Sequence, residues 1–436
     1  MSEGPLPVAA EASRRASGGG PAPHRPPIES IVAQHAEEGA ALRHSRSTLV
    51  RAPHITLRQL RRHDDRIAAH LDGLVVAGPH GLETCARAME HPGTGEAFTL
   101  AFVATAARDA RTLQRLLALA SALPSVRRGV VSALAWRPPG ELTKLLQRLL
   151  EDPAQRLLAL DVCRLLGFDS GDVLVSALRD ASPIVRATAA RAAGELGRTD
   201  TLDALIGLSA AEDAELAYWA ARSALLLGDR HDAVRFLTRI AEVDQGSISD
   251  SALAIVLISS EMASGRDVVR GIARAGARDV RRERRVIRAC GWLGDADSVP
   301  WLIQRMSDPG VARVAAEAMG LITGIDWSVP GRERTRSSPA GEDDEPAESV
   351  GDESLPTPDE AGADAWWSEN VGRMPRGSQS FLGNPPDPSV CRQALRNALQ
   401  RQRSVAALRL KLLQPEEKLF NVRAPAWAQQ ASLGGA

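Results

Sequence analysis

Histidine and cysteine, the residue types that most often do chemistry, are few in this sequence and lie far apart. Eight of the nine histidines precede residue 92, and the ninth is His231. His63 and His70 share a helical face but stand two turns apart, about 10 Å, too far for one metal ion with bonds of about 2 Å. The sequence therefore predicts no metal site.

The nucleophile and cofactor motifs are also missing. Cys85, Cys163, Cys290 and Cys391 form no paired-ligand spacing, so neither a zinc site nor a disulfide framework is indicated. The chain contains no Gly-x-Ser-x-Gly elbow, no phosphate loop and no His-Glu-x-x-His. We predict no catalytic residue and no cofactor, and we expect the protein not to be an enzyme.

A stripe of arginines is the strongest candidate for a charged binding surface. Its members are Arg281, Arg284, Arg285 and Arg288. They fall at i, i+3, i+4 and i+7, so on a helix they would form one face, as a solenoid that tracks a phosphate backbone needs. Alignment of this segment with residues 183–197 places the arginines mostly outside the core. We favour a solvated or acid-paired face, with the acidic segment 342–364 as an internal partner.

Tryptophan and arginine also gather near the C-terminus, where either could anchor an interface. The candidate interaction residues are Trp366, Trp367, Arg401, Arg403, Asn421, Arg423, Pro425 and Trp427. A second interpretation is that they cap the last hydrophobic layer of a repeat array, as terminal repeats must. The sequence leaves both interpretations open.

Composition favours an all-α protein that is not a nucleic-acid binder. Hydrophobic residues make up 44% of the chain and aromatic residues 3%, so the core must be built from Ala, Leu and Val, which suits close-packed helices. The net charge is −1, whereas a phosphate-tracking domain carries a basic excess. No apolar run is long enough to span a membrane. We expect a soluble, cytoplasmic protein.

One local pattern returns along the chain at a period of about 30 residues. Leu-Gly pairs at 166–167, 196–197, 227–228 and 293–294 end helices, and Pro124, Pro153 and Pro183 begin them. Such a period is the signature of stacked helical hairpins. We predict a right-handed α-solenoid of short helical-hairpin repeats with a C-terminal helical tail.

The predicted organisation has four parts. They are a disordered tail over 1–27, the solenoid over 28–330, an acidic disordered linker over 331–365, and a C-terminal tail over 366–430. Residues 337–372 contain eleven Asp or Glu and no Lys or Arg, which is typical of a linker. The C-terminal tail is predicted to hold one long helix over 387–414 and a docking segment after it.

Arginines recur at equivalent positions after successive repeat starts. The predicted ladder comprises Arg127, Arg156 and Arg186 with the acidic turn residues Asp152 and Asp180. Stacked at one repeat spacing, these side chains would tie neighbouring turns together. We favour this structural role over ligand binding.

The repeat units resemble the short HEAT-like repeats first described in phycobilin lyases, whose Asp-Pro, Val-Arg, Ala-Ala and Leu-Gly pattern is matched best by residues 180–206. Residues 63–74, 400–403 and 419–427 are similar to an uncharacterised family of proteobacterial HEAT-repeat proteins often encoded beside type VI secretion genes. This resemblance spans about residues 28–430. It implies an accessory or scaffolding role in the secretion machinery and no chemistry.

Together these features predict a scaffold that binds another protein along its concave helical face, with type VI secretion components as candidate partners. One alternative is a ligand-binding or lyase-like HEAT-repeat protein, which would need convergent polar groups in a deep pocket. A second alternative is a nucleic-acid-binding solenoid that uses the arginine stripe. We expect no membrane insertion, and nucleic acid is the less favoured partner.

Overall fold

A computed structural model of the chain describes residues 27–243, 246–274, 279–333, 352 and 354–434. Nearly all of the predicted disordered tail and the central part of the predicted linker lie outside these residues. The chain forms two compact units. Unit 1 comprises residues 1–50, 57–173 and 423–432, and unit 2 comprises 51–56, 174–422 and 433–436. The boundary at Val173 falls inside the predicted solenoid.

Unit 1 is a series of helices joined by short turns. They are α2 (Glu29–Leu49), α3 (Leu57–Val76), α4 (Pro79–Ala88), α5 (Thr94–Ala106), α6 (Ala110–Ala122), α7 (Pro124–Leu134), α8 (Pro139–Glu151) and α9 (Arg156–Leu166). Apolar residues of α3 recur every three or four positions, and Leu60, Ile67 and Leu71 are fully buried. Because α2 packs against α3 and α5, and α5 against α7, one apolar layer runs through the unit.

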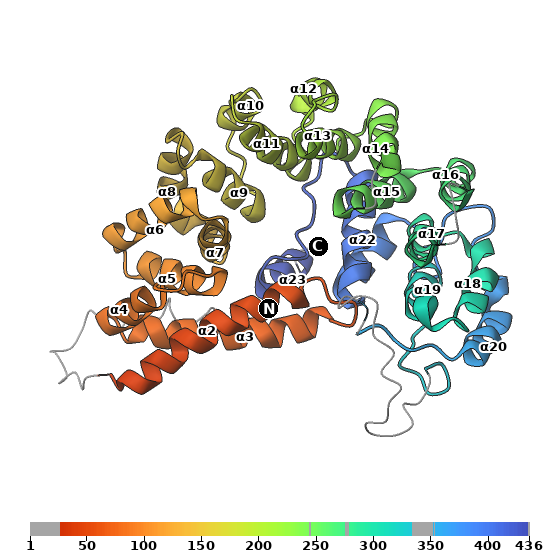
Figure 1. Cartoon of the computed structure of the whole chain (residues 1–436), viewed down its shortest axis with the longest axis horizontal. Coiled ribbons are helices and arrows are strands. Elements are labelled where there is room, and N and C mark those ends of the chain that lie inside the picture. The colour runs from red at the N-terminus through yellow and green to blue at the C-terminus, as the bar shows by residue number, and fades with distance from the viewer. Residues whose placement is uncertain (1–26, 244–245, 275–278, 334–351, 353, 435–436) are drawn as a thin grey trace. The chain divides into compact units, whose positions relative to one another are not determined.

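Unit 2 holds the more regular repeats. Its helices are α11 (Pro183–Leu196), α12 (Leu202–Leu208), α13 (Ala214–Leu226), α14 (Asp232–Val243), α15 (Ser247–Ser259), α16 (Met262–Arg274), α17 (Val280–Leu293), α18 (Val299–Arg305) and α19 (Pro309–Thr323). A short α10 (Asp172–Ala177) lies at the boundary of the units. In Figure 1, α11, α13, α15, α17 and α19 follow one another as an inner row, with α12, α14, α16 and α18 outside it.

The C-terminal part adds α20 (Glu360–Asn370), α21 (Pro388–Asn397), α22 (Gln400–Leu413) and α23 (Ala426–Gly434). Of these, α20 to α22 belong to unit 2, and most of α23 belongs to unit 1. We call residues 379–432 the tail.

The α11 helix shows why the repeats stack closely. Pro183 stands at its first turn, where a missing N–H costs nothing, and Gly197 ends it in the left-handed conformation with φ of 78°. The small residues Ala189 and Ala193 are fully buried, and a side chain at Gly194 would collide with Ser223 of α13. The predicted all-α solenoid of HEAT-like repeats is confirmed.

One predicted helix start is wrong. The prolines that begin α7, α11 and α19 are Pro124, Pro183 and Pro309. Pro153, in contrast, lies in a turn, and α9 begins three residues later at Arg156. The Asp152 carboxylate accepts a hydrogen bond from the main-chain N–H of Ala154 (2.9 Å), and this turn delays the helix.

The long helix predicted over 387–414 is also wrong, because α21 and α22 are separate helices. Ala398 and Leu399 between them are extended, with ψ of 172° and 154°. Leu399 pairs with Thr56 in an isolated antiparallel bridge. Main-chain pairing with another segment therefore replaces one helical turn, a long-range contact that local periodicity does not reveal.

The predicted linker over 331–365 contains ordered structure at its C-terminal end. Asp359 caps α20, and its carboxylate accepts a hydrogen bond from the N–H of Gly362 (2.8 Å). Leu355 is buried in the core that α17, α18 and α19 share. Residues 334–351 of the predicted linker lie outside the described residues.

Candidate interaction sites along the C-terminal tail

Several helix C-termini of unit 2 contact the tail. The last turn of a helix leaves carbonyl groups without intrahelical partners and carries a partial negative charge. Carbonyls near the ends of α11, α15, α17 and α19 accept hydrogen bonds from the tail. We call this set the carbonyl row, and its members are Glu195, Leu257, Ser260, Trp292, Gly294, Leu321 and Ile322.

Main-chain N–H groups of the tail donate to this row at distances of 2.8–2.9 Å. The pairs are Ser380 to Gly294, Leu382 to Leu321, Gly383 to Ile322 and Leu419 to Glu195. Buried carbonyls must find donors, because leaving such a group unpaired costs about 1–3 kcal/mol. The tail therefore caps the inner helices of the solenoid.

Glycine at the repeat ends makes this close approach possible. A Cβ atom at Gly197 would lie 2.5 Å from the carbonyl oxygen of Glu416, and one at Gly294 would lie 2.2 Å from that of Ser380. Both glycines also have positive φ. The glycine of the Leu-Gly pair thus has two functions, since it ends the helix and admits the tail.

Side chains extend the same contact in the middle of the row. The buried guanidinium of Arg409 donates to the carbonyl of Trp292 (3.1 Å) and to Oε1 of Gln379 (2.6 Å). Gln379 in turn donates its amide N–H groups to the carbonyls of Leu257 (3.0 Å) and Ser260 (2.9 Å). Burial lowers the pKa of Arg409.

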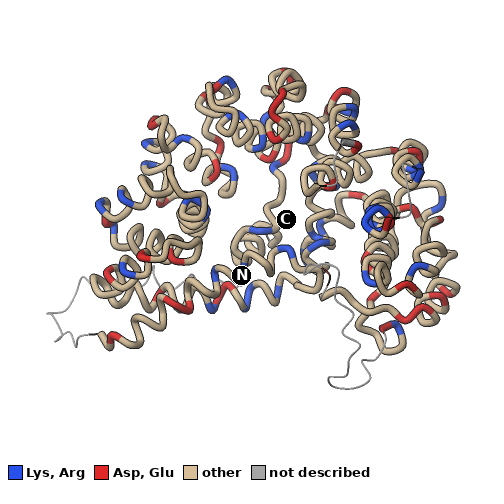
Figure 2. The backbone as a smooth tube through the Cα atoms, in the orientation of Figure 1, with Lys and Arg blue, Asp and Glu red and all other residues tan. Residues whose placement is uncertain are grey.

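The α22 helix carries several buried or half-buried cations, and it packs against α13 and α15 (Figures 1 and 2). Arg403 is 0% exposed and donates to the carbonyl of Leu395 (2.8 Å) and to Oε1 of Gln400 (2.6 Å). Arg401 is half-buried and forms an ion pair with Glu317 of α19 (2.8 Å). Both predicted interaction residues thus make contacts inside this chain.

Lys411 closes the end of α22. Its Nζ donates to the carbonyls of Pro415 and Glu417, the latter at 2.6 Å. Burial lowers the pKa of this lysine to about 8, and the nearby Glu417 partly opposes the shift. A cation at a helix C-terminus also interacts favourably with the helix dipole.

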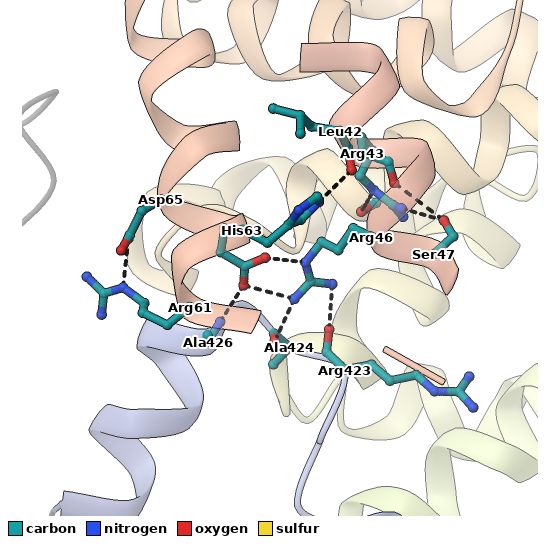
Figure 3. Close-up of polar contacts among 12 residues, drawn as sticks. Leu42, Arg43, Arg46, Ser47, Arg61, His63, Asp65, Arg423, Ala424 and Ala426 are labelled. Atoms are coloured by element: carbon teal, nitrogen blue, oxygen red, sulfur yellow. Dashed lines mark hydrogen bonds and ion pairs between the residues drawn. The ribbon is translucent and has the colours of Figure 1, made fainter. Parts of the chain in front are cut away.

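In unit 1 a different site holds the end of the tail, and Figure 3 shows its polar contacts. Arg46 of α2 and Asp64 of α3 form a buried ion pair with N–O distances of 2.6 and 3.1 Å. Arg46 also donates to the carbonyls of Arg423 (3.0 Å) and Ala424 (2.9 Å). The Asp64 carboxylate accepts a hydrogen bond from the N–H of Ala426 (2.7 Å).

An aromatic contact completes this site. Trp427 packs edge-on against Trp136, with ring centroids 4.9 Å apart, and the Arg46 guanidinium lies 4.9 Å from the Trp136 ring. Pro425, which stands between Ala424 and Ala426 in the sequence, is buried. We call Arg46, Asp64 and Trp136 together the clamp, and the bound residues 423–427 the clamped segment.

Two of the residues singled out in the sequence therefore belong to this site. The Trp427 side chain packs against the clamp, and Pro425 is buried. Arg423 contributes its main-chain carbonyl, while its side chain is exposed. Asn421 is half-buried at the end of unit 2. Trp367 is buried and Trp366 half-buried against the core shared by α18 and α19.

One of the four stripe arginines lies inside the protein, although the alignment placed the stripe mostly outside the core. Arg284 is buried, donates to the carbonyl of Gly310 (2.7 Å) and pairs with Asp352. Arg288 lies 3.7 Å from the second oxygen of the same carboxylate. Asp352 belongs to the acidic segment expected to supply an internal partner, so its charge draws Arg284 inward.

The other stripe members differ from each other. Arg285 donates to the carbonyl of Ala241 (2.7 Å) and pairs with Asp250 (3.1 Å). Arg281 is exposed. Protein groups therefore engage Arg284, Arg285 and Arg288, and the four side chains do not present one continuous face to a phosphate backbone.

The ladder arginines contact main-chain carbonyls of the preceding turn. Arg186 donates to the carbonyls of Asp180 (2.7 Å) and Ala181 (3.0 Å), and Arg156 donates to that of Leu150 (3.3 Å). The Asp152 and Asp180 carboxylates accept from main-chain N–H groups in their own turns. Arg127 is half-buried in the first turn of α7.

Sequence reasoning missed the central residues of both sites, although one signal was present. The buried positions of α3 are Leu57, Leu60, Asp64, Ile67, Leu71 and Leu74. They follow alternating steps of three and four, so Asp64 occupies a core position of an apolar stripe. A carboxylate there requires a buried partner. Arg409 and Gln379 carry no comparable local signal.

We next consider the described residues as possible sites for a metal ion or a small ligand. Among residues 27–243, 246–274, 279–333, 352 and 354–434, no group of three or more His, Cys, Asp or Glu side chains is placed to hold a metal ion. One cavity of about 260 Å³ opens beside α2 and α4, and its polar lining includes Glu29, His80 and Arg87. Burial raises the pKa of the Cys85 and Cys163 thiols to about 12.

Comparison with known proteins agrees with the fold. A family model of HEAT repeats matches residues 171–258, which correspond to the first repeats of unit 2. The match and the architecture define a HEAT-like repeat protein. A search of curated proteins gave no match. In the described part of the chain, none of the helices combines the length and the apolar composition needed to cross a membrane.

Proposed function

We propose that this chain is a non-enzymatic protein-interaction scaffold and that its partners belong to the type VI secretion apparatus. HEAT repeats are commonly interaction scaffolds, because stacked hairpins present a large continuous surface. The choice of partner class is supported by the resemblance of residues 63–74 and 419–427 to HEAT-repeat proteins often encoded beside secretion genes.

The observation that carries this proposal is a half-exposed tryptophan–arginine stack on α11 and α13. The guanidinium of Arg191 lies 4.1 Å from the ring centroid of Trp219, and that of Arg222 lies 5.4 Å from it. Glu195 pairs with both arginines, at 2.9 and 3.6 Å. Trp and Arg are the residues that most often anchor interfaces, and this stack is held in place before any partner binds.

The tail already lies against the inner side of α13 and α15, where the sequence predicted a partner (Figure 1). We infer that a partner binds surface that the tail does not cover. We assign the main contact with the partner to the stack around Trp219. Removing the chain after Gly331 would not test this, because deletion would also uncover the core residues that pack against Leu355 and Trp367.

The test is an affinity capture of partners by the full-length chain and two point variants, read by mass spectrometry. Trp219→Ala should abolish enrichment of secretion-apparatus proteins. Trp366→Ala is the matched control. Trp366 lies on α20, is also half-buried, and has the guanidinium of Arg332 5.9 Å from its ring centroid. Equal enrichment by all three proteins would contradict the assignment to Trp219, and no enrichment by the wild type would contradict the scaffold itself.

A further inference from the structure

The clamp in unit 1 recognises a polypeptide mainly through its backbone. Arg46 donates to two successive carbonyls, those of Arg423 and Ala424, and Asp64 accepts from the N–H of Ala426. All three bonds involve an ionised side chain, and such hydrogen bonds are stronger than neutral ones. These three hydrogen bonds do not require the clamp and the segment to belong to the same polypeptide chain.

Selectivity for this segment comes from its two ring residues. Trp427 packs edge-on against Trp136, an arrangement that aromatic pairs prefer. Pro425 is buried, fixes φ and has no N–H, so it leaves no donor unpaired between the groups that bind Arg46 and Asp64. The clamp therefore fits an Ala-Pro-Ala-Trp segment whose last two residues begin helix α23.

The clamped segment follows a stretch of chain that contains no helix. Residues 414–425 connect α22 to α23 in this way, so the segment can move away from the clamp without breaking a helix. Exchange of an identical element between two copies is a low-cost route to association, because each contact is already optimised. The occupant whose fit is visible in this structure is carried by every copy of the chain.

We propose that the clamp is a receptor for residues 423–427 of a second copy, so that two copies associate by exchanging their C-terminal segments. The partner copy contributes its Ala-Pro-Ala-Trp segment, and Arg46, Asp64 and Trp136 bind it as they bind the segment in cis. This inference does not rest on the proposed secretion partners.

Effective concentration decides how the exchange must be measured. A short tether presents its own segment at roughly millimolar effective concentration, so at micromolar protein the segment in cis outcompetes one in trans by about a thousandfold. Wild-type chains should therefore exchange rarely. Weakening the segment on one copy and the clamp on the other leaves the trans pair as the intact combination.

The experiment mixes two full-length variants with different affinity tags. Trp427→Ala weakens the segment and keeps the clamp, whereas Asp64→Ala breaks the clamp and keeps the segment. We expect the mixture to form a complex in co-capture and light scattering, and each variant alone to remain monomeric. Replacing Asp64→Ala by Asp65→Ala, an adjacent exposed residue paired with Arg61, should remove the gain, because that chain keeps its own clamp filled.

Because Asp64→Ala also weakens unit 1, a second measurement keeps the proposal testable. A fluorescent peptide of residues 419–432 is titrated into the Trp427→Ala chain, whose clamp is intact, and anisotropy is read. We expect saturable binding that the unlabelled peptide competes away and that a peptide with Trp427→Ala lacks. Absence of binding, or co-capture no greater than with the Asp65→Ala control, would overturn the proposal.

Discussion

The two units bind the same tail with opposite chemistry. In unit 2 the solenoid supplies acceptors, the main-chain carbonyls at its helix ends, and the tail supplies N–H groups and cations. In unit 1 the helices supply a buried ion pair, and the tail supplies its own main chain. One contact is distributed over many helices, whereas the other is concentrated in a few side chains.

This difference predicts different sensitivity to mutation. The carbonyl row loses about one hydrogen bond for each changed residue, and a net hydrogen bond contributes about 1 kcal/mol. The clamp depends on two charges that are both buried, and removal of either one leaves the other uncompensated. Single substitutions should therefore damage unit 1 more than unit 2.

The largest expected effect is that of Asp64→Ala. It leaves the Arg46 guanidinium buried without its carboxylate and removes the acceptor for the N–H of Ala426. We expect a loss of about 3–5 kcal/mol in the free energy of unfolding of unit 1. Urea unfolding followed by tryptophan fluorescence measures this loss, since Trp136 and Trp427 belong to this site.

The neighbouring Asp65→Ala is the matched control. Asp65 forms an exposed pair with Arg61, four residues earlier on the same helix. Pairs of that kind contribute at most about 1 kcal/mol. If the two variants unfolded at the same urea concentration, the clamp would not be the main support of unit 1.

A smaller effect is expected from Arg409→Ala in unit 2. The change removes the donor to the carbonyl of Trp292 and the partner of Gln379, and we expect a loss of about 2 kcal/mol. Lysine labelling with mass spectrometry reports whether the tail loosens. Lys411 is buried and should react slowly in the wild type but faster in the variant.

Two features keep this measurement interpretable. Lys144 and Lys418 are exposed and provide the reference labelling rates in the same sample. Arg401→Ala is the matched variant, because Arg401 also lies on α22 but forms a half-exposed ion pair with Glu317. Unchanged Lys411 labelling in Arg409→Ala would show that the remaining carbonyl contacts hold the tail without this arginine.

Acid should weaken unit 1 through a histidine pair at the α2–α3 contact. Nδ1 of His70 lies 3.1 Å from Nδ1 of His35, and burial first, then His35 and Arg66, lower the pKa of His70, while Glu38 raises it. The folded state therefore binds a proton less readily than the unfolded chain. Stability should fall as the pH drops below about 6.5, until the folded state also takes up the proton.

The check is the urea midpoint of wild type and His70→Asn between pH 7.5 and 5. The midpoint of the wild type relative to that of His70→Asn should depend on pH. It should be lowest at the acid end of the range. His44→Asn, at an exposed position of α2, should keep the wild-type profile. A profile of His70→Asn parallel to that of the wild type would refute this role of the pair.

An effect at the opposite, alkaline end of the pH range is expected in unit 2. The pKa of Lys411 is about 8 in the folded protein and higher in the unfolded chain, so the unfolded state binds more protons above pH 8. The contribution of Lys411 to stability should rise between about pH 8 and 10.5. Comparison with Lys411→Met isolates it from the buried cysteines, which titrate in the unfolded chain over the same range.

The fold could be predicted because the repeat signals are local. Proline at a first turn, small residues on one face and Gly at the helix end all stand within a single 30-residue unit, as α11 shows. The break between α21 and α22 could not be predicted, because the pairing of Leu399 with Thr56 joins positions more than 300 residues apart.

The candidate sites were harder to predict for a related reason. The carbonyl row consists of main-chain groups, which every residue possesses, so no residue type marks it. Arg284 shows a second limit, because alignment with residues 183–197 gave its helical position but not the Asp352 carboxylate that draws it into the protein. The clamp was visible in part, through Asp64 in an apolar stripe and through Trp427.

The glycines that admit the tail at the repeat ends also bear on how such a chain can change in length. A solenoid grows by duplication of one hairpin, since each repeat contacts its neighbours alone. Here Ser380 must reach Gly294 while Leu419 reaches Glu195. An extra hairpin between α11 and α17 would shift these acceptors by roughly 9 Å, the spacing of packed helices, and break the match. The spacing of donors along the tail therefore restricts the number of repeats that can lie between α11 and α17.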